Sequence, residues 1–261
     1  MKDMTEVRLP VETFLEETER LVKAGESRGI PLRVCGSVGI YHAIRHDHLA
    51  SSLYALRNGT EAPRIAFKDL DLAAREKNAA AVYRLFVKDF GFQEDRETNA
   101  LFGSFRNIYY HPEFQIDVFY DTLRFNHEIP IKDRLMPGVT LPLEDLFLGK
   151  VQIHAPLRKD LIDLASFAAA VPLARLDAGY LADFFGDDWG LWYDADLNLT
   201  ASLKTLGTLP VDFSSEDRDL VRERLAEYQA LLHVCPKTRR WEKRRAKGVK
   251  ELWYEPVDEV R

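Results

Sequence analysis

Two short apolar segments of the chain carry aspartates where a buried β-strand would normally exclude them. Asp69 and Asp71 lie within residues 67–72, and Asp117 interrupts residues 114–119. A carboxylate beside a hydrophobic core costs free energy unless it is paired or binds a metal ion. Residues two apart on a strand project from the same face, so Asp69 and Asp71 share one face. Three carboxylates converging from neighbouring strands predict an oxygen-rich site suited to Mg²⁺ or Mn²⁺.

A purely structural interpretation is also open, in which Asp69 pairs with Lys68 or Arg75 and Asp117 lies at a strand end. The dipeptide Gly36-Ser37 favours the functional interpretation. It stands between a strand-like segment, residues 32–35, and a helix-like one, where backbone N–H groups and a hydroxyl can hold a phosphate. The turn is not a Walker A loop, because the Gly-Lys-Ser/Thr ending is missing.

Hydrophobic periodicity predicts that these motifs belong to one small mixed sheet. Strand-like and helix-like segments alternate between residues 30 and 121, which is typical of a sheet with flanking helices. The expected strands are 32–35, 65–72, 101–110 and 114–120, the last two forming a hairpin, and the expected helices are 11–29, 38–44 and 76–89. Residues 46–63 end in the turn-forming pair Asn58-Gly59 and have the character of an insertion.

The second half of the chain shows mainly helical periodicity. The expected helices are 143–154, 158–170, 177–185 and 215–234. A candidate linker at Met136-Pro137-Gly138 divides the chain into two predicted domains, 1–136 and 137–261. The predicted fold class is therefore α+β: a small mixed sheet with flanking helices, followed by a mostly helical C-terminal domain.

The composition is that of a globular chain with a sizeable core, at 46% hydrophobic and 30% charged residues. No apolar run approaches the ~18 residues that a membrane-spanning helix needs, and the N-terminus lacks the pattern of a signal peptide. Two cysteines exclude a disulfide framework and a multi-cysteine zinc site. We therefore expect a cytoplasmic protein without a membrane partner. A formal charge of −6 argues against a chain that coats nucleic acid over its whole surface.

In this order, the motifs resemble the nucleotidyltransferase fold of the DNA polymerase β superfamily, and more narrowly its bacterial branch of AbiEii-type toxins. The resemblance spans residues 33–167. It is carried by Gly36-Ser37, Lys68-Asp69-Leu70-Asp71-Leu72, Asp117-Val118-Phe119, Leu141–Leu146, Gly149–Gln152 and Arg158–Asp163. The chain departs from the family where residues 38–68 separate Ser37 from Asp69, a longer stretch than usual that must loop out.

The resemblance implies transfer of a nucleoside monophosphate from a nucleoside triphosphate (NTP) to an acceptor hydroxyl, with release of pyrophosphate. Asp69, Asp71 and Asp117 would be the catalytic residues and would hold Mg²⁺ or Mn²⁺. The acceptor could be an RNA or tRNA end, a protein hydroxyl or a small molecule such as an aminoglycoside. Two alternatives stay open: a catalytically inactive nucleotide-binding or regulatory module, and an interaction partner in a toxin–antitoxin pair with a cognate antitoxin.

The resemblance also implies a nucleotide-binding set drawn from both halves of the chain. Gly36 and Ser37 would hold the phosphates, while Lys150 and Asp160 would contact the nucleotide. A lysine in this pattern can instead be a surface residue with a buried stem. Asp160 and Asp163 lie one helical turn apart, so they could also fix Lys150 or an arginine.

The segment 237–250 reverses the acidic balance of the chain. It holds eight Lys and Arg residues against one acid, Glu242, with Trp241 inside it and further aromatic residues just beyond. Basic residues interleaved with aromatic ones are typical of a surface that grips RNA. The candidate RNA contacts are Arg239, Arg240, Arg244 and Arg245. The alternative is a terminal helix packed against the acidic body of the protein.

Overall fold

The computed structural model describes residues 9–59, 63–209 and 213–256. The chain divides into two compact units. Unit 1 comprises Met1–Gly39, Ile65–Arg124 and Ile129–Pro142, and unit 2 comprises Ile40–Arg64, Phe125–Glu128 and Leu143–Arg261. Two segments from the first half of the chain therefore group with the second half. The predicted division into domains 1–136 and 137–261 stays a prediction.

Unit 1 is built on a five-stranded mixed sheet, as the sequence predicts. The strand order is β1-β2-β5-β4-β3, in which only β2 and β5 pair in parallel. The strands are β1 (Arg33–Val34), β2 (Asp69–Ala74), β3 (Gln93–Glu94), β4 (Arg106–Tyr110) and β5 (Gln115–Tyr120). A second sheet pairs β6 (Thr122–Arg124) with β7 (Glu128–Pro130), which the sequence pattern does not predict.

Helices cover the sheet of unit 1. They are α1 (Val11–Glu26), α4 (Ala79–Tyr83) with the short 3-10 helix η2 (Glu76–Asn78) before it and the π-helix η3 (Arg84–Asp89) after it, and α5 (Arg96–Phe102). Phe14 of α1 packs on Phe67 and Phe114, with ring centroids 5.1 Å and 4.7 Å away. The helix predicted over 76–89 is confirmed, and Gly91 follows its end with a φ of +71° that glycine tolerates best.

Two predicted strands begin later than the sequence pattern suggests. The strand expected from residue 65 begins at Asp69, because its partner β5 begins opposite at Gln115. The strand expected from residue 101 begins at Arg106, because the preceding residues form α5. The Asp95 carboxylate starts that helix by accepting a hydrogen bond from the backbone N–H of Thr98 at 3.0 Å.

The predicted insertion at 46–63 contains a helix of unit 2. After α2 (Gly36–Ile44), the chain forms α3 (His48–Ala55) and the turn η1 (Leu56–Asn58). Asp47 caps α3 by accepting a hydrogen bond from the N–H of Ala50 at 2.9 Å. Because α3 packs against α7, this segment is part of the core of unit 2 rather than a surface loop.

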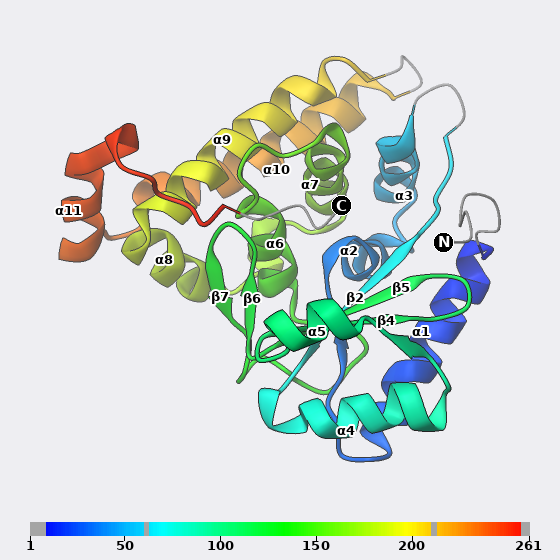
Figure 1. Cartoon of the computed structure of the whole chain (residues 1–261). Coiled ribbons are helices and arrows are strands. Elements are labelled where there is room, and N and C mark those ends of the chain that lie inside the picture. Colours follow the sequence, from blue (N-terminus) through cyan, green and yellow to red (C-terminus); the bar gives the residue numbers. More distant parts are fainter. Residues whose placement is uncertain (1–8, 60–62, 210–212, 257–261) are drawn as a thin grey trace. The chain divides into compact units, whose positions relative to one another are not determined.

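Unit 2 is otherwise helical, as predicted. The remaining helices and turns are α6 (Leu143–Val151), α7 (Arg158–Ala170), η4 (Leu173–Arg175), α8 (Ala178–Asp187), α9 (Trp189–Leu206), α10 (Ser215–Val234), α11 (Arg239–Lys247) and η5 (Gly248–Lys250). The helices α7, α9 and α10 lie side by side (Figure 1). An aromatic cluster joins four helices of this unit: Phe147 of α6, Phe167 of α7, Phe185 of α8 and Tyr228 of α10. Within the described residues, no helix is long and apolar enough to cross a membrane.

The two leucines of α9 test how this helix stabilises unit 2. Leu199 is completely buried, whereas Leu197 on the same helix is 45% exposed. We expect Leu199→Ala to lower the free energy of unfolding by about 2–5 kcal/mol, because it leaves a cavity in the core. Leu197→Ala is the matched control and should change it by no more than about 0.5 kcal/mol. Equal losses in urea unfolding would contradict the position of α9.

Candidate functional site

The parallel pairing of β2 with β5 gathers the predicted catalytic aspartates on one face of the sheet. Asp71 is the register partner of Asp117, and Asp69 is the partner of Gln115. Side chains at such partner positions lie on the same side of the sheet. Asp69 is exposed at the start of β2 and Asp71 is half-buried, while Asp117 is only 5% exposed.

The predicted phosphate-binding turn lies directly against Asp71. The backbone N–H of Cys35 donates to the carbonyl oxygen of Asp71 at 2.9 Å. Gly36 follows with a φ of +59°, and a Cβ at this position would stand 1.9 Å from Oδ2 of Asp71. Only a glycine allows this approach, so Gly36 serves both the turn and the close contact. Ser37 is half-buried beside it in α2.

Asp117 is already held by two hydrogen-bond donors. Arg106 donates to Oδ1 of Asp117 from Nη2 at 2.9 Å and from Nε at 3.2 Å. The Gln115 side-chain amide donates to Oδ2 at 2.9 Å. Asp117 stands within β5 and not at its end, and its basic partner comes from the neighbouring strand β4. The sequence predicts that these two strands form a hairpin, but only the register of β4 on β5 shows that Arg106 contacts Asp117.

The three carboxylates of Asp69, Asp71 and Asp117 are of a type that suits a hard divalent cation, but their arrangement in this structure does not form a metal site. Carboxylate oxygens on one face are the ligands that Mg²⁺ and Mn²⁺ prefer. Among the residues that the structure describes, however, no group of three or more His, Cys, Asp or Glu is arranged to hold a metal ion. Asp117 would have to exchange Arg106 for the ion. The three-aspartate metal site therefore stays a proposal.

The predicted nucleotide-binding residues of the second half meet in a buried charge cluster of unit 2. Nζ of Lys150 lies 3.1 Å from Oδ1 of Asp160 and 2.8 Å from Oδ2 of Asp163. Lys150 is 7% exposed, so the surface-lysine alternative is wrong. Burial by itself lowers the pKa of Lys150, but the carboxylates of Asp163 and Asp160 outweigh burial and hold this pKa above its ordinary value.

Arg57 completes the cluster and was not among the predicted residues. Its Nε and Nη2 atoms donate to the two oxygens of Asp163 at 3.0 Å and 3.2 Å. Asp160 also accepts a hydrogen bond from the N–H of Leu157 at the start of α7. The two aspartates thus fix both a lysine and an arginine. The sequence pattern does not predict this role for Arg57, because Arg57 lies in the segment 46–63, which has the character of an insertion.

The basic tail forms the short helix α11, which packs on unit 2. Trp241 is buried in it, and Arg240 forms an ion pair with Asp187 of α8 at 2.8 Å. Arg244 donates to two backbone carbonyl oxygens of the following turn. Arg245 pairs with Glu242 at 3.5 Å, and Arg239 is exposed. The helix packs as the structural alternative expects, and the four arginines stay proposed RNA contacts.

The contact between Gly36 and Asp71 can be tested by comparing two glycines of unit 1. Gly36→Ala should lower the free energy of unfolding by about 1–3 kcal/mol, because the methyl group meets both an unfavourable φ and the Asp71 carboxylate. The matched control is Gly29→Ala, where φ is +69° and nothing lies within 4 Å of the added Cβ. In the control, the free energy of unfolding should fall only by the cost of the unfavourable φ, about 1 kcal/mol. Thermal unfolding giving equal losses would contradict the close contact.

Removing the charge of Asp163 should destabilise unit 2 strongly. Asp163→Asn leaves the cations of Arg57 and Lys150 buried with one carboxylate fewer, which should cost about 3–5 kcal/mol. The control is Asp219→Asn in α10, where the ion pair with Arg222 is exposed. That change should cost no more than about 1 kcal/mol. Urea unfolding compares the two, and a loss below about 1 kcal/mol for Asp163→Asn would contradict the cluster.

Comparisons with known proteins add little to this geometry. No protein-family model matches the chain, and no curated protein does. Among solved structures, the chain is similar to the solution structure of the antibiotic-resistance factor ANT(2'')-Ia. The two share 12% sequence identity over 85% of this chain and 96% of that chain, with a TM-score of 0.34. The α+β fold class rests on the sheet and helices described above.

Proposed function

We propose that the protein is a metal-dependent nucleotidyltransferase that moves a nucleoside monophosphate from an NTP to an acceptor hydroxyl and releases pyrophosphate. One observation supports this most. The register of β2 on β5 brings Asp71 opposite Asp117, and the Gly36 turn lies against Asp71. Carboxylates beside a backbone turn that can hold phosphates suit phosphoryl-transfer chemistry.

In this proposal, the residues of unit 1 have distinct roles. Asp69, Asp71 and Asp117 would hold Mg²⁺ or Mn²⁺, which supplies charge neutralisation at the phosphoryl oxygens when bound. Gly36 and Ser37 would bind the phosphates through backbone N–H groups and the hydroxyl. A bond forms between the acceptor oxygen and the α-phosphorus as the α–β phosphoanhydride bond breaks. Asp117 would take the proton of the acceptor hydroxyl.

Lys150 and Asp160 remain proposed nucleotide contacts in unit 2. Lys150 would act as a point charge on the triphosphate, a role common for lysine. Its ammonium group is already shared between two carboxylates, which keeps it charged. Membership of the AbiEii-like branch, a tRNA end as acceptor and a cognate antitoxin are further proposals that rest on the sequence motifs alone.

One observation favours a second candidate function, an inactive nucleotide-binding module. Arg106 and Gln115 together occupy both carboxylate oxygens of Asp117. An arginine at this place can neutralise the carboxylate without a metal ion. Such a protein would bind an NTP on the Gly36 turn and transfer nothing.

Labelled NTPs separate the two functions. Each α-³²P-labelled NTP is offered in turn with Mg²⁺ and with total RNA, total protein or aminoglycosides. We expect this screen to reveal one acceptor that becomes labelled. Asp71→Asn should reduce labelling by roughly two orders of magnitude or more, because it removes a proposed metal ligand. The matched control is Asp133→Asn, an exposed aspartate of the same unit, which should label normally.

Mn²⁺ binding measured by electron paramagnetic resonance with a non-hydrolysable NTP gives a readout independent of the acceptor. The wild-type protein should bind Mn²⁺ and Asp71→Asn should not. Mn²⁺ and NTP binding without labelling of any acceptor would favour the inactive module. Mn²⁺ affinity unchanged by Asp71→Asn would overturn the metal site.

A further inference from the structure

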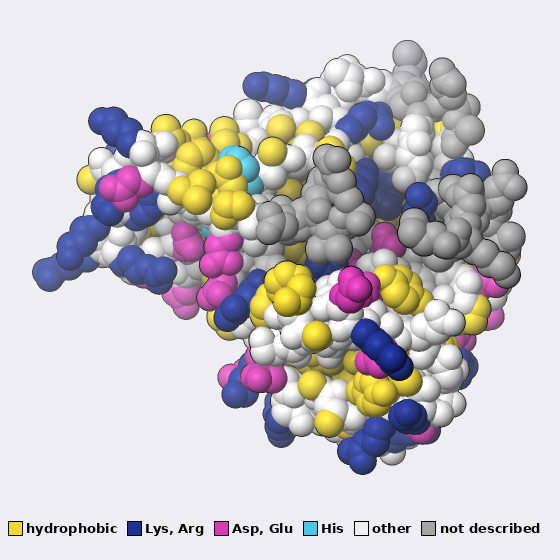
Figure 2. All heavy atoms as spheres, in the orientation of Figure 1, with side chains coloured by type: hydrophobic (Ala, Val, Ile, Leu, Met, Phe, Trp, Pro, Cys, Tyr) yellow, Lys and Arg dark blue, Asp and Glu magenta, His cyan; other side chains and the backbone are white. Residues whose placement is uncertain are grey.

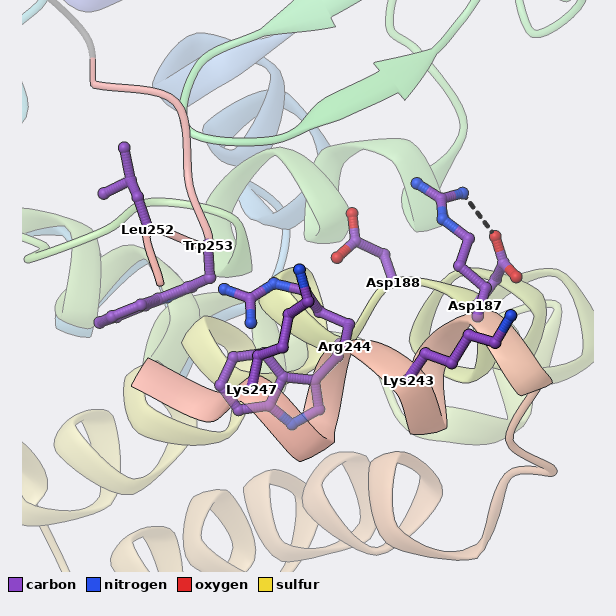
Figure 3. Close-up of a pocket in the computed structure, with 9 residues that line it drawn as sticks. Asp187, Asp188, Lys243, Arg244, Lys247, Leu252 and Trp253 are labelled. Atoms are coloured by element: carbon purple, nitrogen blue, oxygen red, sulfur yellow. Dashed lines mark hydrogen bonds and ion pairs between the residues drawn. The ribbon is translucent and has the colours of Figure 1, made fainter. Parts of the chain in front are cut away.

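A pocket of about 550 Å³ lies in unit 2 where α11 and the segment after it meet the junction of α8 and α9. Figure 3 shows Lys243, Arg244 and Lys247 projecting from α11, with Leu252 and Trp253 on the segment that returns past them. We propose that this pocket binds one nucleotide of a single-stranded polynucleotide, with the phosphates on its two sides on Lys243 and Lys247 and the base against Trp253. Binding here does not depend on the proposed transfer reaction.

The charges lining the pocket leave positive charge available to a ligand. Of its two carboxylates, Asp187 is paired with Arg240, and Asp188 accepts a hydrogen bond from the N–H of Leu191 as the cap of α9. Lys243 has no hydrogen bond or ion pair with any residue that the structure describes. A phosphate group supplies the oxygen acceptors that this ammonium group lacks.

Lys247 is the second cation that a phosphate could use. It forms an ion pair with Glu251 at 2.7 Å, but both side chains are more than half exposed. An exposed pair of this kind contributes little stability, so a phosphate can compete with Glu251 for the ammonium group. Lys243 and Lys247, one helical turn apart on α11, therefore both line the pocket, Lys243 extending toward Asp187 and Lys247 beside Arg244 (Figure 3).

The aromatic side of the pocket is fixed in place. The indole N–H of Trp253 donates to Oδ1 of the buried Asp194 at 3.2 Å, which sets the plane of the ring. Trp189 lies edge-on to it at 6.4 Å, and Leu252 beside it is 63% exposed. A base stacked on such a ring contributes about 1–3 kcal/mol and needs no particular sequence.

Backbone contacts hold this wall in the shape that a ligand would meet. Arg244 donates to the carbonyl oxygens of Gly248 and Glu251 at 2.9 Å and 2.6 Å. The segment then exchanges hydrogen bonds with Asn126, through the N–H and carbonyl oxygen of Glu255. A wall that is ordered before binding saves the ordering cost that a flexible tail would have. Arg244 therefore helps to hold this wall in place.

The charge outside the pocket favours a polymer over a free nucleotide. Arg239, Arg245 and Lys250 continue the positive surface beyond the pocket, and Figure 2 shows Lys and Arg side chains gathered around α11. The chain as a whole carries −6, so a polyanion needs such a local surface. Bases of a duplex are already stacked on one another, so the pocket fits an unpaired strand.

The test is the affinity of a fluorescein-labelled RNA of about 12 nucleotides, within the usual site sizes of about 4–16. Lys243→Gln/Lys247→Gln should weaken binding at least about tenfold and reduce the log–log salt slope by about 1.4, at about 0.7 per lost phosphate contact. The control Lys23→Gln/Arg96→Gln removes the same charge from exposed positions of unit 1 and should leave both quantities nearly unchanged.

Leu252→Ala separates base contact from charge. It should weaken RNA binding about two- to fivefold with the salt slope unchanged, because an apolar contact releases no counterions. A base near Trp253 should also give an ultraviolet crosslink from 4-thiouridine RNA to that residue. Equal effects of the pocket and control pairs would overturn the proposal. So would equal affinity for a duplex of the same length, or binding of uridine monophosphate as tight as that of the oligonucleotide.

Discussion

The parallel ladder between β2 and β5 is the constraint on which the candidate site depends. Its register is fixed by the other face of the same strands, where Leu70, Leu72, Ile116 and Val118 are buried. A slip of one residue would turn these side chains outward and drive the carboxylates into the core. The hydrophobic face therefore determines which acids meet on the opposite face.

Much of this arrangement could be predicted from the sequence, because it depends on local patterns. The alternation of Leu and Asp in β2, the hairpin between β4 and β5 and the turn at Gly36 are each readable over a few residues. The ion-pair partner of Asp117 could not be predicted from such a local pattern. Arg106 meets it only through the hairpin register, which depends on the shape of a turn and not on composition.

Unit 2 was harder to predict because its buried residues are partly polar. α9 buries Asp194, Asn198 and Ser202 together with its leucines, so the sequence lacks the apolar stripe that normally marks a helix. The hydrogen-bond partners of these polar side chains lie in segments far away in the sequence. Oδ2 of Asp194, for example, lies 2.9 Å from Nε2 of His127, while Oδ1 lies 3.1 Å from Nδ1 of His154. Such pairings are visible only once the chain has folded.

The packing of α3 against α7 has a consequence for the order of events during synthesis. Arg57 and its partner Asp163 are 106 residues apart in the chain. At about 5–20 residues per second, a ribosome needs about 5–20 s to cover that distance. Throughout this interval α3, whose buried residues are Ala50, Leu53 and Tyr54, has no α7 to pack against, and it presents an apolar surface open to chaperones. The first half of this chain therefore leaves the ribosome with α3, a part of the core of unit 2, still exposed until α7 has been synthesised.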